Sequence, residues 1–404
     1  MKSVYLDYAA SAPVALEVSQ AMAPYFEKQF GNPGSVHGFG REAQAALDAS
    51  RQTVAKLLGV DFLDVIFVAS ATEANNLMLQ GAVKQYHRLN KDQKTELPHI
   101  ITSVIEHESV LAVCRDLEEQ QLARVSYIPV DHNGFVGAAA ISRALRPETI
   151  LVSVMYFNNV TGAVQPLSEI GAIIKSFKKD KLSPKHYSQY LPRELLYPIF
   201  HTDAAQAIHS LELIELAKIG VETMTISSHK IYGPKGGGAL AANFPISLGL
   251  APCLIGGLQE FGLRAGTPDL PNIVGFARAM SLVRQEIKQE IKHAKAIRQQ
   301  LLQGIIKAYP RAVVNSHPPY IDGVCNISFP GFGLEELLYR FDQRCIAVAA
   351  GSACSAKALN PSHVLRAMGL TDSVALSSVR FSFGRYTSKQ EVSYCLEQLP
   401  YILS

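Results

Sequence analysis

Residues 227–238 read Ser-Ser-His-Lys-Ile-Tyr-Gly-Pro-Lys-Gly-Gly-Gly, directly after the apolar run Thr223–Ile226. Lys230 closely follows this predicted strand, with small hydroxyl residues before it and a glycine-rich turn after it. Such a lysine is suited to be a partly desolvated amine that can form a Schiff base. An isolated loop lysine is more often an ordinary surface residue. The interpretation of Lys230 therefore depends on what the rest of the chain places beside it.

Apolar runs of strand length alternate with segments of helical periodicity from about residue 41 to residue 245. The alternation is typical of βαβ units, and it predicts an α/β fold with a mainly parallel central sheet flanked by helices. One helix is predicted over Arg41–Leu58, with Gly59 as its stop. The predicted strands are 65–68, 99–102, 150–154, 199–201 and 223–226. Ligands of such sheets bind at the carboxyl ends of the strands, so the residues after each run are candidates for a site.

The pattern changes after about residue 262, where a long charged helix from Leu282 to Ile306 precedes shorter strands and helices. We expect a large α/β domain over residues 15–262. Residues 1–14 and 263–404 are expected to form a smaller α+β domain. The proline-containing stretch at about 177–198 is predicted to be an insertion on the surface of the large domain.

The composition excludes several classes of protein. A chain of 404 residues, 48% of them hydrophobic, is long enough for a large core. Its net charge of +3 comes from scattered basic residues, so no nucleic-acid partner is predicted. The segment Met1–Asp7 does not read as a signal peptide, and no apolar run is long enough to cross a bilayer. A cytoplasmic protein without a membrane partner is therefore expected.

Two more strand ends carry groups that suit a phosphate and a pyridine ring. After the strand at 65–68, Ser70 and Glu73 resemble a capping box, and Thr72 adds a hydroxyl to a helix start that could bind phosphate. A capping box without a ligand is the more common case. Asp203 could keep a pyridine nitrogen protonated, or it could equally cap the next helix. With Lys230 following in the same chain order, these groups indicate one cofactor pocket.

The whole pattern resembles the pyridoxal-phosphate enzymes of aminotransferase class V, and specifically the cysteine desulfurases of the NifS/IscS type. The resemblance runs nearly end to end and implies a fold-type-I architecture, pyridoxal 5'-phosphate as cofactor and a homodimer. Besides the Asp203 and Lys230 segments, it rests on Tyr5–Pro13, Gly31–His37, Ala71–Glu73, Glu106–Ser109, Asn158–Asn159, Gly256–Thr267, Gly351–Ser355 and Arg380–Arg385.

The resemblance also assigns roles to single residues. Lys230 would hold the cofactor and later remove the Cα proton, and His107 would lie over the ring as a second catalytic residue. Arg380 would bind the substrate carboxylate with a bidentate geometry that lysine cannot supply, with Asn158 beside it. The cofactor-binding residues would be Ala71, Thr72, His107, Asn158, Asp203, Gln206, Ser227, His229 and Lys230, with Thr267 reaching in from the partner subunit.

The implied reaction removes sulfur from L-cysteine, releases L-alanine and leaves a persulfide on Cys354. Cys354 lies within the small-residue run Ala349–Ala356, which predicts a mobile loop suited to receive sulfur in the pocket and present it outside. A lone cysteine is more often inert, but this loop and its place after Lys230 reverse that preference. The sulfur acceptor would be another protein, such as an iron–sulfur scaffold or a tRNA-thiolation carrier. The remaining cysteines, which show no disulfide or metal-site spacing, are interpreted as inert: Cys114, Cys253, Cys325, Cys345 and Cys395.

Two of the chain's departures from the family would touch the pocket rim and the dimer contact. Leu258, Phe261 and Ala265 stand where the family often has Gly, Arg and Ser, and Val160 and Thr161 replace the usual Glu-Ile. Two alternative functions stay open. Another class V reaction, such as that of a selenocysteine lyase or an aminotransferase, would not need the persulfide cysteine, and a non-catalytic sulfur-relay scaffold would keep the fold alone.

Overall fold

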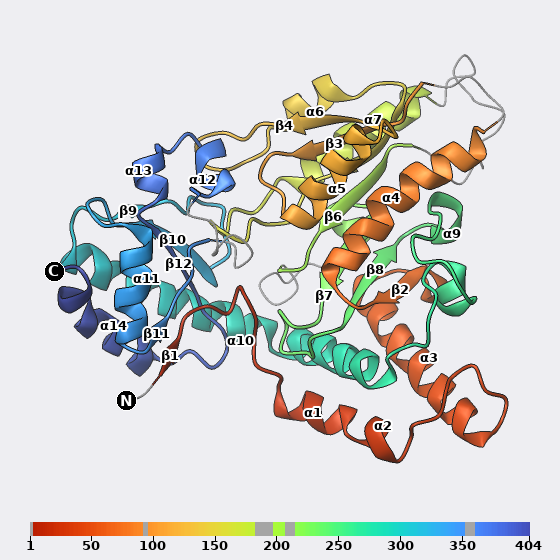
Figure 1. Cartoon of the computed structure of the whole chain (residues 1–404), viewed down its shortest axis with the longest axis horizontal. Coiled ribbons are helices and arrows are strands. Elements are labelled where there is room, and N and C mark those ends of the chain that lie inside the picture. Colours follow the sequence, from red (N-terminus) through yellow and green to blue (C-terminus); the bar gives the residue numbers. More distant parts are fainter. Residues whose placement is uncertain (1–2, 92–95, 182–196, 207–214, 352–359) are drawn as a thin grey trace.

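The computed structural model describes residues 3–91, 96–181, 197–206, 215–351 and 360–404 (Figure 1). Within this part of the chain, the largest sheet has seven strands in the order β2-β8-β7-β6-β5-β3-β4. Its strands are β2 (Val65–Val68), β3 (His99–Ser103), β4 (Arg124–Ile128), β5 (Thr149–Ser153), β6 (Ile199–Asp203), β7 (Thr223–Ser227) and β8 (Gly238–Ala242).

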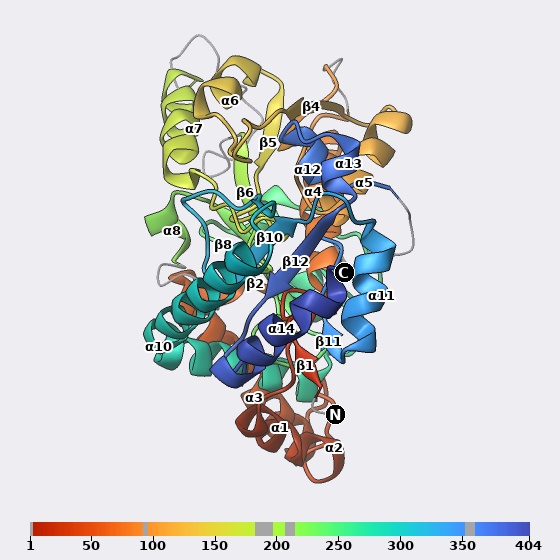
Figure 2. The same cartoon turned by 90° about the vertical axis from the view of Figure 1, so that its left-hand side faces the viewer.

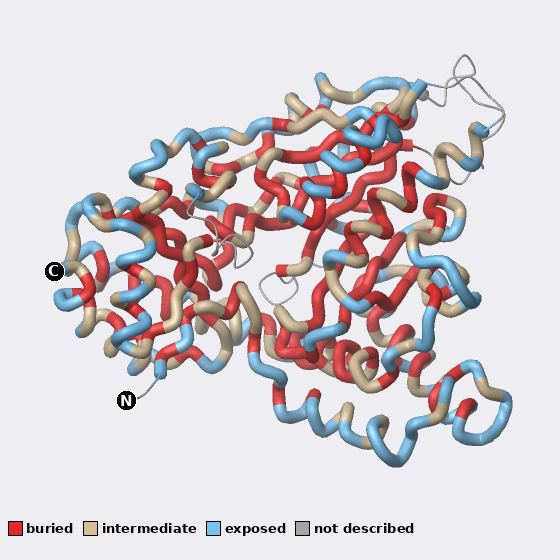
Figure 3. Tube along the Cα trace, in the orientation of Figure 1, coloured by how far each residue is buried: buried red, intermediate tan, exposed pale blue. Residues whose placement is uncertain are grey.

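All strands of this sheet run parallel except β8, which is antiparallel to both of its neighbours, β7 and β2. The prediction of a mainly parallel sheet is confirmed, and all five predicted strands belong to it. All five are buried along their whole length on both faces, as expected for short apolar runs in a parallel sheet. Figure 3 shows this buried centre. Neither β4 nor β8 was predicted from the sequence.

Helices cover both faces of the sheet, because successive strand residues point to opposite sides. Val65 and Phe67 pack into one core with α3, α7 and α10, whereas Ile66 and Val68 pack into another with α4 and α5. The bounds of the flanking helices are α3 (Gly38–Leu58), α4 (Ala71–Leu89), α5 (Glu108–Glu119), α6 (Ala138–Ala144), α7 (Leu167–Lys181), α8 (Leu216–Ile219) and α9 (Ile246–Gly249). The predicted helix 41–58 thus begins at Gly38, and it ends as predicted at Gly59 in the left-handed region.

The C-terminal elements gather around a second, antiparallel sheet in the order β12-β10-β9. The helix predicted at 282–306 is longer, since α10 spans Leu270–Ala308 and packs on α3 and then on α14. The N-terminal strand β1 (Val4–Tyr5) pairs with β11 (Ile346–Ala347) in this region, as Figures 1 and 2 show. The other elements are α1 (Leu16–Met22), α2 (Pro24–Glu27), β9 (Val313–Val314), β10 (Val324–Ser328), α11 (Leu334–Gln343), α12 (His363–Ala367), α13 (Asp372–Ala375), β12 (Ser378–Ser382) and α14 (Lys389–Ile402).

The first residues of the predicted insertion at 177–198 are helical, because α7 continues to Lys181. Residues 182–196 lie outside the described part of the chain. The division into domains at residues 14 and 262 stays a prediction. Among the described helices, none combines the length and apolar character that a bilayer crossing requires.

Candidate active site

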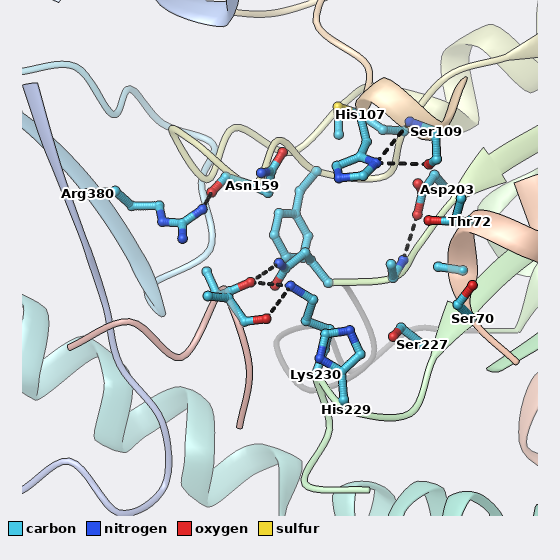
Figure 4. Close-up of a pocket in the computed structure, with 17 residues that line it drawn as sticks. Ser70, Thr72, His107, Ser109, Asn159, Asp203, Ser227, His229, Lys230 and Arg380 are labelled. Carbon is cyan, nitrogen blue, oxygen red and sulfur yellow. Dashed lines mark hydrogen bonds between the residues drawn. The ribbon is translucent and has the colours of Figure 1, made fainter. Parts of the chain in front are cut away.

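A cavity of about 240 Å³ lies at the carboxyl ends of the parallel strands. Its walls come from the segments after β2, β3, β5, β6 and β7, together with the N-terminal segment and β12. Figure 4 shows that His107, Asp203, Lys230 and Arg380 project into this space from different sides. The sequence-predicted residues that line it are Ala71, Thr72, His107, Asp203, Gln206, Ser227, His229, Lys230 and Arg380.

Asn158 is buried next to the cavity and does not line it, whereas Asn159 does. The Asn158 Oδ1 accepts the backbone N–H groups of Val160 and Thr161 at 2.9 and 3.1 Å, and its Nδ2 donates to the carbonyl of Ile105 at 3.0 Å. Asn158 therefore fixes the shape of the loop that presents Asn159.

One more predicted residue, Thr267, lies away from this cavity. Thr267 lines a neighbouring cavity of about 150 Å³, whose wall also includes Gly238, the first residue of β8. Cys354 lies at 352–359, outside the described residues, so its predicted loop is not described either. The chain before that segment adjoins the site, because Ala349 and Arg380 exchange backbone hydrogen bonds of 3.1 and 2.7 Å.

The N-terminus of α4 faces the cavity and has the features of an anion site. Ser70 caps the helix, its Oγ accepting the Glu73 N–H at 3.1 Å, and the Glu73 carboxylate accepts the N–H of Ala69 at 2.7 Å. The first N–H groups of a helix have no partner within it, so those of Ala71 and Thr72 are available to a ligand.

Two observations at this helix start fit a phosphate group. Ser227 lines the cavity at 1% exposure, and its Oγ has no hydrogen-bond partner among the described residues. A buried hydroxyl without a partner is costly, and a phosphate oxygen would satisfy it. Residue 238 must be glycine for β8 to approach the start of α4 this closely. A Cβ there would lie 2.8 Å from the Ile226 carbonyl oxygen and 3.1 Å from the Ser70 carbonyl carbon.

His229 lines the same side of the cavity. Burial, together with the nearby charges of Lys230 and Lys235, lowers the pKa of His229 to about 4, so the ring is neutral at physiological pH. A neutral imidazole can donate one hydrogen bond to an anion without adding a second buried charge beside the lysine. The residues on this wall therefore fit the phosphate of a cofactor.

Asp203 lies across the cavity at the end of β6 and is almost completely buried. Its two oxygens accept from neutral donors, Oδ1 from the N–H of Ala205 at 2.9 Å and Oδ2 from Nδ2 of Asn75 at 2.8 Å. Among the described residues no cation pairs with it. A protonated pyridine nitrogen would supply the missing charge, because buried carboxylates are stable when paired. The helix that Asp203 was alternatively predicted to cap would fall on residues 207–214, outside the described part of the chain.

Lys230 lies at the start of the glycine-rich turn after β7, and backbone carbonyls orient its side chain by accepting hydrogen bonds from it. Its Nζ donates to the carbonyls of Ala9 and Ala10, the second at 2.9 Å. Gln206 Nε2 donates to the same Ala9 oxygen at 2.6 Å. The N-terminal segment therefore forms the wall against which the candidate nucleophile is oriented.

Arg380 and His107 close the remaining sides. Arg380 is 1% exposed, and its guanidinium donates to the Asn159 carbonyl at 3.1 Å and to Asp7 Oδ1 at 2.7 Å. Burial lowers the pKa of Arg380, and the charge of Asp7 opposes that effect. His107 is the N-cap of α5, with Nδ1 accepting the Ser109 N–H at 3.1 Å.

Four residues that shape this site were not predicted from the sequence: Asp7, Asn75, Ser109 and Asn159. Asp7, Ser109 and Asn159 stand inside the motifs quoted above and Asn75 lies two residues after Ala71–Glu73, but none follows a strand in the way that marked Lys230 or Asp203. Their contribution is a contact with a distant element, which spacing along the chain does not reveal. Among the described residues there is no group of acidic, cysteine or histidine side chains that could hold a metal ion.

Comparison with known proteins confirms the resemblance inferred from the motifs. The sequence profile of the family described as aminotransferase class-V matches residues 4–182 and 195–395. The gap in this match falls within the predicted insertion and is shorter than it. The chain is 37% identical over 400 residues to a cysteine desulfurase of Rattus norvegicus, covering 98% of this chain and 82% of the relative. It is 35% identical over 403 residues to the cysteine desulfurase IscS of Dictyoglomus turgidum, covering 100% of this chain and 95% of the relative.

Solved structures show the same fold. A NifS-like protein superimposes with a TM-score of 0.87 at 30% identity, covering 100% of this chain and 99% of that protein. A structure described as SspA in complex with cysteine has a TM-score of 0.77 at 33% identity, covering 96% of this chain and 100% of that protein. The similarity therefore extends over the sheet, the C-terminal elements and every segment that lines the cavity.

Proposed function

Since the chain belongs to the aminotransferase class-V family and, within it, to the cysteine desulfurases, we propose that the cavity beside Lys230 removes sulfur from L-cysteine and releases L-alanine. The observation that carries this proposal is the meeting of Lys230, Asp203, His107 and Arg380 around one cavity. The start of α4, the Asp203 carboxylate and the Lys230 amine suit a phosphate-bearing pyridine aldehyde, and the buried Arg380 guanidinium suits the carboxylate of an amino acid.

Pyridoxal 5'-phosphate is the proposed cofactor, and bound there it would supply an electron sink for the Cα carbanion. Its phosphate would be held by the α4 N–H groups of Ala71 and Thr72, with Ser227 and His229 donating from the other side. Asp203 would keep the ring nitrogen protonated, Gln206 would serve the ring hydroxyl, and Lys230 would bind the aldehyde carbon through Nζ. Thr267 of the partner subunit is proposed to complete the phosphate site.

Different residues of this chain would bind the substrate and transfer its protons. Arg380 would bind the carboxylate of L-cysteine, with the loop held by Asn158 beside it. Lys230 Nζ would accept the proton from Cα, and the carbonyls of Ala9 and Ala10 would stabilise the ammonium that results. His107 would stack over the ring and hold a proton at its free nitrogen.

Cys354 is proposed as the sulfur acceptor within the enzyme. A bond would form between the Cys354 sulfur and the substrate sulfur as the Cβ–S bond of the substrate breaks. The released three-carbon unit would take up protons and leave as alanine. Cys354 lies five positions after Ala349 in the sequence, and an extended chain of that length spans at most roughly 17 Å. Because Ala349 pairs with Arg380 at the cavity wall, this reach supports the assignment.

The proposed enzyme is a homodimer. Large apolar side chains are exposed on two segments: Phe26, Phe30, Val36 and Phe39 around α2 and the start of α3, and Ile255, Leu258 and Phe261 before the Thr267 cavity. Figure 3 shows how little the first of these segments is covered. Exposed apolar clusters of this kind favour a protein partner. Light scattering of the purified protein should give twice the chain mass of 44.0 kDa, and a monomer at micromolar concentration would contradict the proposal.

The decisive experiment combines product analysis with mapping of the cofactor. Purified protein should convert L-cysteine into alanine and, with a reductant present, sulfide. Borohydride reduction followed by peptide mass spectrometry should find the cofactor on Lys230 and not on Lys235, the exposed lysine of the same turn. A protein that forms alanine without sulfur transfer would instead favour another class V reaction. A protein that binds no cofactor would favour the scaffold. Which protein accepts the sulfur stays a prediction, with an iron–sulfur scaffold as one candidate.

A further inference from the structure

The hydrogen bonds at the start of α5 determine which nitrogen of His107 carries a proton. As the N-cap, His107 accepts the backbone N–H of Ser109 at Nδ1, so that nitrogen has no proton of its own. The Ser109 hydroxyl oxygen lies 2.8 Å from the same Nδ1, and it must therefore donate as well. The neutral ring then carries its proton at Nε2, the nitrogen that takes no part in these contacts (Figure 4).

The direction of the hydroxyl is fixed independently by Asn75. The amide Nδ2 of Asn75 donates one hydrogen to Ser109 Oγ at 2.8 Å and the other to Asp203 Oδ2 at 2.8 Å. Ser109 Oγ is thus already an acceptor from Asn75, which leaves its own proton for His107. The reverse orientation of the amide would place Oδ1 against the carboxylate of Asp203, where two acceptors would face each other.

A second histidine holds the amide in this orientation. His201 is fully buried, and burial lowers its pKa to about 3, so the ring is neutral. Its Nδ1 lies 3.0 Å from Thr223 Oγ1 and its Nε2 lies 3.4 Å from Asn75 Oδ1. With Nε2 as the donor to Asn75 and Nδ1 as the acceptor from Thr223, every group in the chain of hydrogen bonds has one consistent role.

We propose that Ser109 is a positioning residue for the reaction, and that with Asn75 it couples the tautomer and orientation of His107 to Asp203. The inference rests on the proposed function for its catalytic consequence, since His107 is the group that would contact the cofactor and the reacting atoms. Inside a buried site such a network is strong only when all its members are satisfied. Removing one hydroxyl should loosen the imidazole without unfolding the helix, because the cap from the Ser109 backbone N–H is retained.

Nitrogen NMR of protein labelled with 15N-histidine tests the geometry directly, in the apoprotein as well as with cofactor. The wild type should show His107 as the Nε2–H tautomer. Ser109→Ala should shift and broaden the His107 Nδ1 resonance, and Ser109→Thr should restore it. His37 is an internal reference, because it caps α3 through Nδ1 with the N–H of Gly40 at 3.3 Å. A wild-type Nδ1–H tautomer, or an unchanged Nδ1 resonance in Ser109→Ala, would overturn the proposal.

Kinetics test the catalytic consequence. Ser109→Ala should lower kcat about fivefold, the size expected for one hydrogen bond, with little change in KM or in cofactor affinity. Ser109→Thr should recover most of kcat. Ser126→Ala is the matched control, since Ser126 Oγ lies 2.9 Å from Nε2 of another buried histidine, His99. Equal loss of kcat in Ser126→Ala and Ser109→Ala would contradict a specific role. A wild type with the expected tautomer and no desulfurase activity would instead refute the proposed function.

Discussion

Arg380 Nη2 donates to Asp7 Oδ1 at 2.7 Å, so the guanidinium proposed to bind the substrate carboxylate is already paired with a carboxylate of the N-terminal segment. Arg380 is almost wholly buried, whereas the side chain of Asp7 is 18% exposed. An arginine at this depth needs a negative partner, because an uncompensated buried charge is strongly destabilising. Asp7 therefore keeps the site stable before substrate arrives, and it also repels an incoming carboxylate.

Asp7→Asn should separate these two effects. Asparagine keeps an oxygen in place to accept from Arg380 and removes the negative charge. The KM for L-cysteine should fall severalfold, because the substrate would become the first negative partner of the guanidinium. The melting temperature of the substrate-free protein should fall at the same time. Steady-state kinetics and thermal unfolding with and without L-cysteine measure both effects, and a higher KM would show that Asp7 mainly orients Arg380.

Lys230→Ala should abolish alanine production and the visible absorbance of bound cofactor while the protein stays folded. The change removes an amine that no other described residue lining the cavity could replace. Lys235→Ala is the matched control, since this exposed lysine belongs to the same glycine-rich turn, and it should keep both properties. Normal alanine formation by Lys230→Ala would show that the assignment of the nucleophile is wrong.

Asp203→Asn tests whether the carboxylate serves the ring nitrogen or only the backbone. Asparagine can still accept the N–H of Ala205, so a capping role would survive the change. The loss of a charged hydrogen bond to the ring should lower kcat about a hundredfold while some cofactor stays bound. Unchanged turnover would favour the capping interpretation, and cofactor occupancy by absorbance separates a binding defect from a catalytic one.

Glu106 should make the stability of the protein depend on pH. Its carboxyl is completely buried beside the site, where Ser103 and the N–H of Met155 donate to Oε1. Burial is the main cause that raises the pKa of Glu106 to about 8, and the charge of Asp203 adds to it. The folded protein thus binds a proton that the unfolded chain releases above its ordinary pKa. This contribution to stability is present below about pH 4.5 and is lost as the pH rises through 8.

Glu106→Gln should remove this part of the pH dependence, because the amide resembles the protonated carboxyl. Between pH 5 and 8 the wild type should lose up to about 1.4 kcal/mol per pH unit relative to the variant. Urea unfolding of the substrate-free proteins across this range measures the difference. Parallel stability curves for the two proteins would contradict a protonated Glu106.

The strands of the large sheet that the sequence predicted correctly share one physical property, which is a short run of mostly β-branched or aromatic residues buried on both faces. The two strands of that sheet that were missed lack this combination. The strand at 238–242 consists of glycine, alanine and leucine and continues a glycine-rich turn, so it resembles a loop. The strand at 124–128 is an edge strand that begins with an exposed arginine. The helix predicted from Leu282 begins at Leu270 in the structure. Its first turns were missed because they are mostly apolar and carry few of the charges that marked the remainder.

The candidate site was predictable where a residue follows a strand, as Lys230 and Asp203 do, because parallel strands end at a common edge. The contacts that support those residues were not predictable from spacing. Asn75 reaches Asp203 across 128 positions, and Ala9 accepts from Lys230 through a backbone carbonyl that has no signature in the sequence. The motifs therefore predicted which chemical groups the site contains, whereas tertiary packing determines how those groups are oriented.

Cys354→Ser should separate desulfuration from cofactor binding. Serine keeps size and polarity but removes the group that is nucleophilic as a thiolate, so cofactor and L-cysteine should still bind while sulfide and alanine formation are lost. Burial raises the pKa of the Cys114, Cys325 and Cys395 thiols to about 12, 11 and 12, which makes them poor substitutes. Mass spectrometry of the wild type treated with L-cysteine, without reductant, should place one extra sulfur on the Cys354 peptide. Wild-type rates in Cys354→Ser, or the extra sulfur on Cys345, would refute the persulfide assignment.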